Sequence, residues 1–202
     1  MNPKLIVEQK ITAFANKYRI FGVGSGGEKG DLLAFAQQKR LAFKEKVTFY
    51  GDEQKSNEIF SFRAEKVMDV HGRYFVEDSG GQQIGAFRKD FKKSLTSSTW
   101  HVLDENGQAK ITISESNPAL AIFRRFAGFI PIIGGLAEII TVFFKYHFVL
   151  TDNSSGQPIG KYQKTKLIRD HYQLSMDEPS YKKTDWRVLA AVSVALDALQ
   201  SR

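Results

Sequence analysis

The sequence predicts a closed antiparallel β-barrel that encloses a hydrophobic helix near its C-terminus. Short runs of β-branched and aromatic residues alternate with clusters of Gly, Asp, Asn and Ser, which is typical of antiparallel strands joined by tight turns. The last helical segment is apolar around almost its whole circumference, so other parts of the protein must surround it. A chain of 202 residues can bury such a core within one domain.

Three segments share one hairpin pattern, in which a strand-like run is followed by a turn and a second run. They are residues 73–88, 100–113 and 146–162. The first and third correspond most closely, because Ile84-Gly85 recurs as Ile159-Gly160 and a lysine stands four positions after each glycine. Two related halves are too few for a solenoid, so closure of one sheet on itself is the favoured architecture.

The segment 186–200 predicts the enclosed helix, with Asp185 as its N-cap. It is short and rich in alanine, which is unlike a membrane-spanning helix. We therefore expect a single domain over residues 1–202, with strands from about 4 to 184 and a central helix over about 186–200.

Several motifs resemble those of a known family. The order Tyr74-Phe75-Val76-x-Asp78-x-Gly80, Ile84-Gly85-x-Phe87-Arg88-Lys89 and Ser94-Leu95-x4-Trp100, with Leu196-Asp197 in the terminal helix, is similar to the phospholipid scramblase and LURP-one-related group of the tubby C-terminal-like superfamily. The resemblance implies a mainly β fold with about twelve antiparallel strands around a central C-terminal helix.

The composition narrows the functional classes. The absence of cysteine excludes disulfides, thiolate metal sites and cysteine nucleophiles, and it fits a reducing compartment such as the cytoplasm. A net charge of +7, from 29 basic and 22 acidic residues, favours anionic partners. We expect a cytoplasmic protein that acts peripherally at the inner membrane surface.

Basic clusters follow the related hairpins of the two halves, and they predict one face that binds phosphate groups. The candidate lipid- or anion-binding residues are Arg88, Lys89, Lys92, Lys93, Lys161, Lys164 and Lys166. The favoured function is a non-enzymatic module that binds anionic phospholipid head groups. An alternative function is that of a regulator, whose partner is a nucleic acid or another protein.

A second alternative is a nucleotide-binding enzyme that uses the loop Gly22–Gly27, which satisfies G-x-G-x-x-G. A helix-compatible stretch, Asp31–Phe43, follows it. However, the residues before the loop alternate between polar and apolar, unlike a buried parallel strand, and Lys29-Gly30 interrupts a helix start. A flexible hairpin loop is the favoured interpretation.

We expect no catalytic residue, metal site or cofactor. The four histidines His71, His101, His147 and His171 lack the i, i+4 spacing of a helical metal site, and no serine lies in a nucleophile elbow. Asp152–Gly156 fits a hairpin turn better than a calcium loop.

The longest apolar run is Phe126–Phe144, which has the minimum length of a membrane-spanning helix. Pro131, the pair Gly134-Gly135 and Glu138 all disfavour a spanning helix. We therefore expect this run to form part of a soluble fold.

Overall fold

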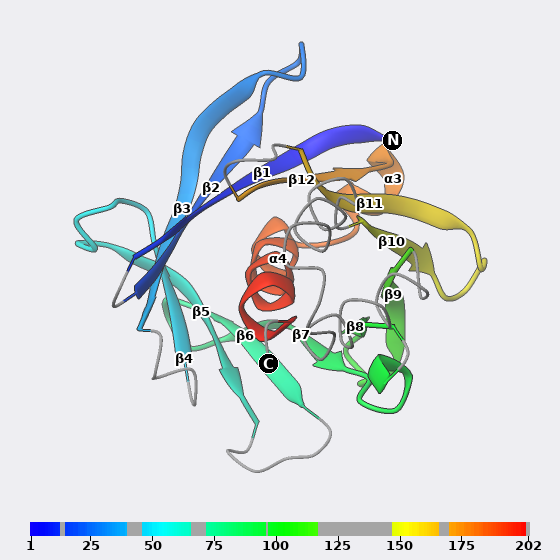
Figure 1. Ribbon diagram of the computed structural model, residues 1–202. Coiled ribbons are helices and arrows are strands. Elements are labelled where there is room, and N and C mark those ends of the chain that lie inside the picture. The colour runs from blue at the N-terminus through cyan, green and yellow to red at the C-terminus, as the bar shows by residue number, and fades with distance from the viewer. Residues whose placement is uncertain are drawn as a thin grey trace, which may run out of the picture.

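The computed structural model describes residues 1–12, 15–39, 46–65, 72–95, 97–116, 147–165 and 170–200. Within these ranges, twelve antiparallel strands close into a barrel around a C-terminal helix, which confirms the predicted fold (Figure 1). The strands are β1 (Asn2–Ile11), β2 (Ala15–Val23), β3 (Lys29–Lys39), β4 (Lys46–Tyr50), β5 (Glu58–Ala64), β6 (Arg73–Asp78), β7 (Gln83–Lys89), β8 (Thr99–Leu103), β9 (Ala109–Glu115), β10 (His147–Asp152), β11 (Pro158–Lys164) and β12 (His171–Met176).

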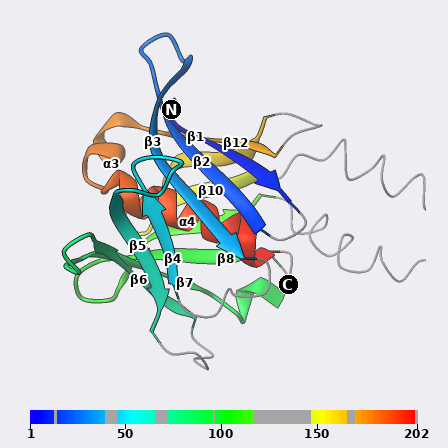
Figure 2. The same ribbon diagram turned by 90° about the vertical axis from the view of Figure 1, so that its left-hand side faces the viewer.

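Each strand pairs with its neighbours in sequence, and β1 closes the barrel by pairing with both β2 and β12. This up-and-down order places all connections from even to odd strands at one end of the barrel. The helix α4 (Trp186–Gln200) begins there, so we call it the entry end (Figure 2). The last residues of the odd-numbered strands, such as the end of β7, lie at the opposite, exit end.

The predicted hairpins are confirmed as β6–β7, β8–β9 and β10–β11. Each begins its turn with an aspartate whose carboxylate accepts backbone N–H groups. Asp78 accepts from Gly80 and Gln82, both at 2.9 Å. Asp104 and Asp152 play the same part in their turns. A glycine with positive φ then completes each turn, as only glycine readily does. Asp152–Gly156 is therefore a hairpin turn.

The helix α4 is the centre of the core, as its all-round apolar sequence predicts. Leu189, Ala190, Val194 and Ala195 are each fully buried. Large aromatic side chains from the strands pack around the helix, including Trp100 on β8. The small alanines let the strands approach the helix closely from every side, which allows a helix to fit within the barrel.

The strands end earlier than the sequence predicts. β12 ends at Met176, and a short helix α3 (Glu178–Lys182) takes the place of the strand expected up to about 184. Asp177 caps α3 by accepting a hydrogen bond from the Ser180 N–H at 2.8 Å.

The apolar run Phe126–Phe144 lies outside the described residues. Within the described residues, no helix is both long enough and apolar enough to cross a membrane.

Candidate functional site

The last two residues of β7 and the connection after it, at the exit end, provide four of the predicted site residues. We call Arg88–Lys93 the basic loop. Asp90 shapes it, because its Oδ1 accepts the Lys93 N–H at 3.0 Å and its carbonyl accepts the Ser94 N–H at 2.8 Å. The short 3-10 helix η1 (Lys93–Leu95) starts from this turn. The turn leaves the side chains of the loop's tip on the surface.

Phe91 stands at the tip of the basic loop and is 45% exposed. Only Met1 and Ile11 are comparably exposed large apolar residues among the described part of the chain. A Cβ atom on Gly72 would lie 2.8 Å from Phe91 Cε2, so the glycine lets the ring rest against the neighbouring connection. The Lys89 ammonium lies 5.7 Å from the centre of the Phe91 ring. The basic loop thus presents an exposed aromatic ring with the ammonium of Lys89 close to it.

His101 on β8 supports the basic loop from beneath. Its Nε2 lies 3.3 Å from Asp90 Oδ2, and its Nδ1 lies 3.0 Å from the Thr112 hydroxyl. Burial lowers the pKa of His101, and the Arg88 charge lowers it further, although Asp90 opposes both. Burial alone would raise the pKa of Asp90, but hydrogen bonds from the Lys93 N–H and His101 outweigh it and lower that pKa. The carboxylate that holds the loop therefore stays ionised.

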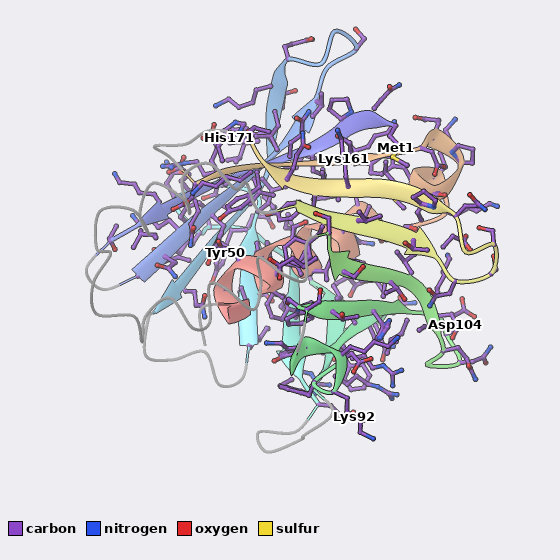
Figure 3. All side chains as sticks on the ribbon, turned by 45° about the vertical axis from the view of Figure 1, so that its right-hand side comes forward. Met1, Tyr50, Lys92, Asp104, Lys161 and His171 are labelled. Atoms are coloured by element: carbon purple, nitrogen blue, oxygen red, sulfur yellow. The ribbon has the colours of Figure 1, made fainter. Side chains whose placement is uncertain are left out.

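The remaining predicted residues lie elsewhere. Lys161 is exposed on the outer face of β11, and Lys164 forms an ion pair with Asp170 at 2.6 Å. Three strands, β8, β9 and β10, separate β7 from β11, so the structure does not bring the two basic clusters into one face. Lys92 and Lys161 accordingly lie apart in Figure 3. Lys166 lies outside the described residues.

The turn chemistry places several carboxylates at the entry end. Asp78, Asp104 and Asp152 begin the three hairpin turns there, and Asp177 and Asp185 accept backbone N–H groups at the starts of α3 and α4. The basic loop lies at the opposite, exit end, and its cations attract anions.

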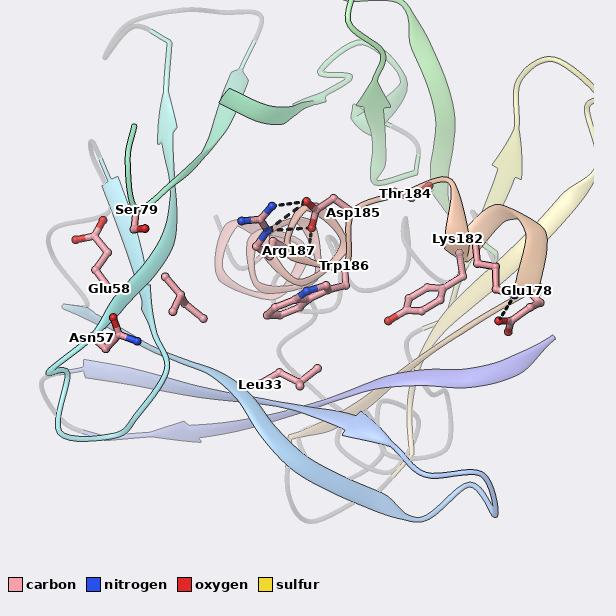
Figure 4. Close-up of a pocket in the computed structure, with 12 residues that line it drawn as sticks. Leu33, Asn57, Glu58, Ser79, Glu178, Lys182, Thr184, Asp185, Trp186 and Arg187 are labelled. Carbon is pink, nitrogen blue, oxygen red and sulfur yellow. Dashed lines mark hydrogen bonds and ion pairs between the residues drawn. The ribbon is translucent and has the colours of Figure 1, made fainter. Parts of the chain in front are cut away.

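The entry end is hollowed on two sides of the start of α4. One groove, of about 900 Å³, runs between β3 and the β4–β5 connection, and Leu33, Ile59, Tyr181 and Trp186 form its apolar lining (Figure 4). A second, of about 860 Å³, lies between the β8–β9 turn and the segment before α4.

The N-terminus of α4 lies between these grooves, and a side chain of the protein already neutralises it. Asp185 accepts the Arg187 N–H at 2.9 Å and pairs with the Arg187 guanidinium at 2.7 Å. Burial alone would raise the pKa of Asp185, but the hydrogen bonds from Arg187 outweigh it and lower that pKa. The carboxylate therefore occupies the place where an anionic ligand would meet the helix dipole. The entry end suits apolar ligands better than phosphate groups.

The glycine segment Gly22–Gly27 covers the end of β2 and the turn to β3 in an antiparallel hairpin, as the favoured interpretation predicts. β3 occupies Lys29–Lys39, so the described part of the stretch Asp31–Phe43 is a strand and not the helix that a dinucleotide fold places after its glycines. The helix N-terminus that would bind a diphosphate is therefore not next to this loop. Among the described residues, no cluster of three or more His, Asp or Glu side chains is placed to hold a metal ion.

Phe91, Asp90 and His101 were not among the site residues predicted from the sequence. The placement of an aromatic residue between two basic pairs was a signal for Phe91. The contact between Asp90 and His101 depends on the register of β7 and β8, which pairs Arg88 with His101. No local pattern reveals that register.

Comparison with known protein families identifies one family. A family model described as LURP-one-related matches residues 33–197. A comparison with curated proteins gave no match. The matched range begins within β3 and ends within α4, so it includes the basic loop and most of the barrel together with its central helix. The chain therefore belongs to the LURP-one-related family.

Proposed function

We propose that this protein is a non-enzymatic binding module whose basic loop docks on anionic phospholipid head groups at the cytoplasmic surface of a membrane. The exposed ring of Phe91, in a loop with four basic residues and next to the ammonium of Lys89, is the observation on which the proposal rests. An aromatic ring can enter the boundary between head groups and acyl chains while the surrounding cations meet phosphate groups. The resemblance to scramblases and tubby-like proteins fits this use.

The expected affinity is modest and mainly electrostatic. Each Lys or Arg near an anionic bilayer contributes about 1 kcal/mol, so Arg88, Lys89, Lys92 and Lys93 together supply up to roughly 4 kcal/mol. Phe91 adds an apolar contribution that does not depend on salt. Binding should therefore be reversible and weaken as salt rises, because the Debye length falls from about 30 Å at 0.01 M to about 8 Å at 0.15 M.

The test is flotation with vesicles of phosphatidylcholine alone or mixed with phosphatidylserine. Replacing Arg88, Lys89, Lys92 and Lys93 together by alanine should weaken binding to the anionic vesicles by up to about a thousandfold. The matched control removes four cations from the entry end, by replacing Lys29, Lys55, Lys182 and Lys183 with alanine. This control should bind almost as the parent does, although both variants have lost the same charge.

Phe91→Ala separates insertion of the ring from simple charge attraction. Phe91→Ala should weaken binding to anionic vesicles at every salt concentration. In the basic-loop quadruple variant, the binding that remains should depend much less on salt. Equal loss in the two quadruple variants would mean that total charge, not the basic loop, governs binding. No binding of the parent to anionic vesicles would overturn the proposal.

A further inference from the structure

The exit end carries an exposed apolar residue besides Phe91. Ile11 is the last residue of β1, and its side chain is 52% exposed. It lies on the same face of β1 as Leu5 and Val7, which are buried in the core. A side chain that points inward and is still exposed at the end of its strand stands at the mouth of the barrel.

Two lysines stand beside Ile11 and face each other across neighbouring strands. Lys10 on β1 pairs in register with Lys17 on β2, and both side chains lie on the outer face, because the alternate positions face the core. Neither lysine forms an ion pair within the described part of the chain. Their charges reach Glu53, but this carboxylate is already bound to Arg19 at 2.6 Å. We call Lys10, Ile11 and Lys17 the β1–β2 corner, and its two charges are free to meet an anion from outside.

Opposed like charges distinguish the exit end. In the described strands, three register pairs join residues of like charge, and all three are basic and lie at this end: Lys10 with Lys17, Lys46 with Arg63, and Arg73 with Arg88. Like charges directly opposite one another destabilise a sheet, so each pair costs stability unless another group neutralises it.

Only the middle pair is fully neutralised by carboxylates of the protein. Lys46 lies 3.0 Å from Glu58. Arg63 lies 2.8 Å from Glu77. In the third pair, no described carboxylate forms an ion pair with Arg88, at the start of the basic loop. Uncompensated charge therefore remains at two places, the β1–β2 corner and the basic loop, and each place also has an exposed apolar side chain.

These two places lie on opposite walls of the barrel. The closed order of twelve strands puts β7 six strands away from β1 in either direction. Figure 1 shows β1 and β7 on opposite sides of α4, and in Figure 2 β1 and α4 end on the same side of the barrel. A surface that touches both Ile11 and Phe91 must therefore lie across the mouth of the barrel and not along one wall.

We propose that the β1–β2 corner is a second membrane contact, so that the barrel docks on an anionic bilayer with its whole exit mouth. This inference rests on the proposed function, because it adds a second contact with the same membrane. Ile11 enters the boundary between head groups and acyl chains, while Lys10 and Lys17 meet phosphate groups. A nucleic acid could also meet the two lysines, but it offers no apolar layer to Ile11.

The first test uses fluorescent labels. The chain contains no cysteine, so one introduced thiol can carry a nitrobenzoxadiazole group. Ile11→Cys and Phe91→Cys report on the two contacts. Asn106→Cys, at an exposed position in the turn between β8 and β9, is the matched control at the entry end. With vesicles that contain phosphatidylserine, the labels at residues 11 and 91 should brighten, and lipids with a nitroxide on the acyl chain should quench them. The label at residue 106 should not respond.

The second test removes the charges of the corner. Replacing Lys10 and Lys17 together by alanine should weaken vesicle binding by up to about thirtyfold. Replacing Lys182 and Lys183 by alanine removes the same charge from the entry end and should change binding little. The corner variant loses a repulsive pair, so its thermal unfolding temperature should stay the same or rise. Weaker binding by this variant is then not a sign of unfolding.

The outcomes separate this inference from the proposed function. If the label at residue 91 responds to vesicles and the label at residue 11 does not, the second contact is wrong and the basic loop still binds. Equal weakening by the two double variants would also refute the second contact. A label at residue 11 that responds to a DNA duplex but not to vesicles would assign the corner to nucleic acid instead. If the parent itself does not float with anionic vesicles, the proposed function fails and this inference fails with it.

Discussion

Gly85 on β7 and Val188 on α4 approach so closely that only glycine fits. A Cβ atom on Gly85 would lie 2.5 Å from Val188 Cγ2, well inside the contact distance of two carbons. The matching glycine of the other half, Gly160, faces a different neighbour, because its Cβ would lie 2.7 Å from the Ser175 carbonyl oxygen. The repeated Ile-Gly pair thus has a steric cause in both halves, at the helix in one and at the adjacent strand in the other.

Gly85→Ala should destabilise the protein by about 1–3 kcal/mol, the usual cost of adding a group to a packed core. Val188 cannot move aside easily, because it is 3% exposed and β-branched side chains in a helix have one favoured rotamer. Combining the change with Val188→Ala should relieve the clash, so a double-mutant cycle of urea unfolding should give a favourable coupling energy.

Gly22→Ala is the matched control. A Cβ atom there would lie 3.6 Å from Leu33, an ordinary contact, so its free energy of unfolding should change little. Strictly additive effects of Gly85→Ala and Val188→Ala would contradict the close approach of β7 and α4.

The helix α4 should be essential to the fold. Leu196 is 2% exposed within the barrel, so Leu196→Arg leaves a buried charge without a partner, a change that costs about 3–5 kcal/mol. We expect the variant, and a chain truncated before Trp186, to be insoluble or to lack a cooperative thermal transition. Leu196→Met, which keeps the volume and polarity, should retain it. A truncated chain that unfolds cooperatively near the parent's temperature would refute the role of α4 as the core.

Much of the fold could be predicted from the sequence because it depends on interactions between residues that are close together in the chain. Asp78 and Gly81 specify a turn through hydrogen bonds and a positive φ that lie within four residues. The all-round apolar character of Trp186–Gln200 similarly requires enclosure, whatever the surrounding strands are.

The site was less predictable because it depends on which strands lie beside each other. The basic clusters on β7 and β11 look equivalent in the sequence, but the strand order separates them by three strands. The aspartates of the three hairpin turns likewise come to one end of the barrel only because alternate connections lie at opposite ends.

Asp197 should make the protein less stable as the pH rises. The carboxylate accepts hydrogen bonds from the Tyr18 and Tyr172 hydroxyls, each at 3.0 Å. Burial raises the pKa of Asp197, and these two hydrogen bonds offset only part of that effect. The folded state then binds the proton more tightly than the unfolded state does. The stabilisation is complete below the unfolded pKa of about 3.9 and is lost as the pH rises through the folded pKa.

Asp197→Asn removes this ionisation, so the stability of the variant relative to the parent should improve from about pH 4 upward and then level off. Urea unfolding of both proteins between pH 4 and 8 measures the difference at each pH. If the free energies of unfolding of the two proteins change with pH in parallel, or if the parent gains stability relative to the variant as the pH rises, the pKa of Asp197 is not raised by folding.

His101 should act in the opposite direction. Its pKa is lowered, chiefly by burial, so the folded state binds its proton less tightly than the unfolded state. The resulting stabilisation is present above about pH 6.5 and is lost as the pH falls through the folded pKa. His101→Gln keeps an amide donor for Asp90 but cannot ionise, so the parent should lose stability relative to this variant as the solution becomes acidic. NMR titration of the imidazole C–H signals gives the pKa directly, and a His101 value at or above about 6.5 would contradict the expected loss of stability.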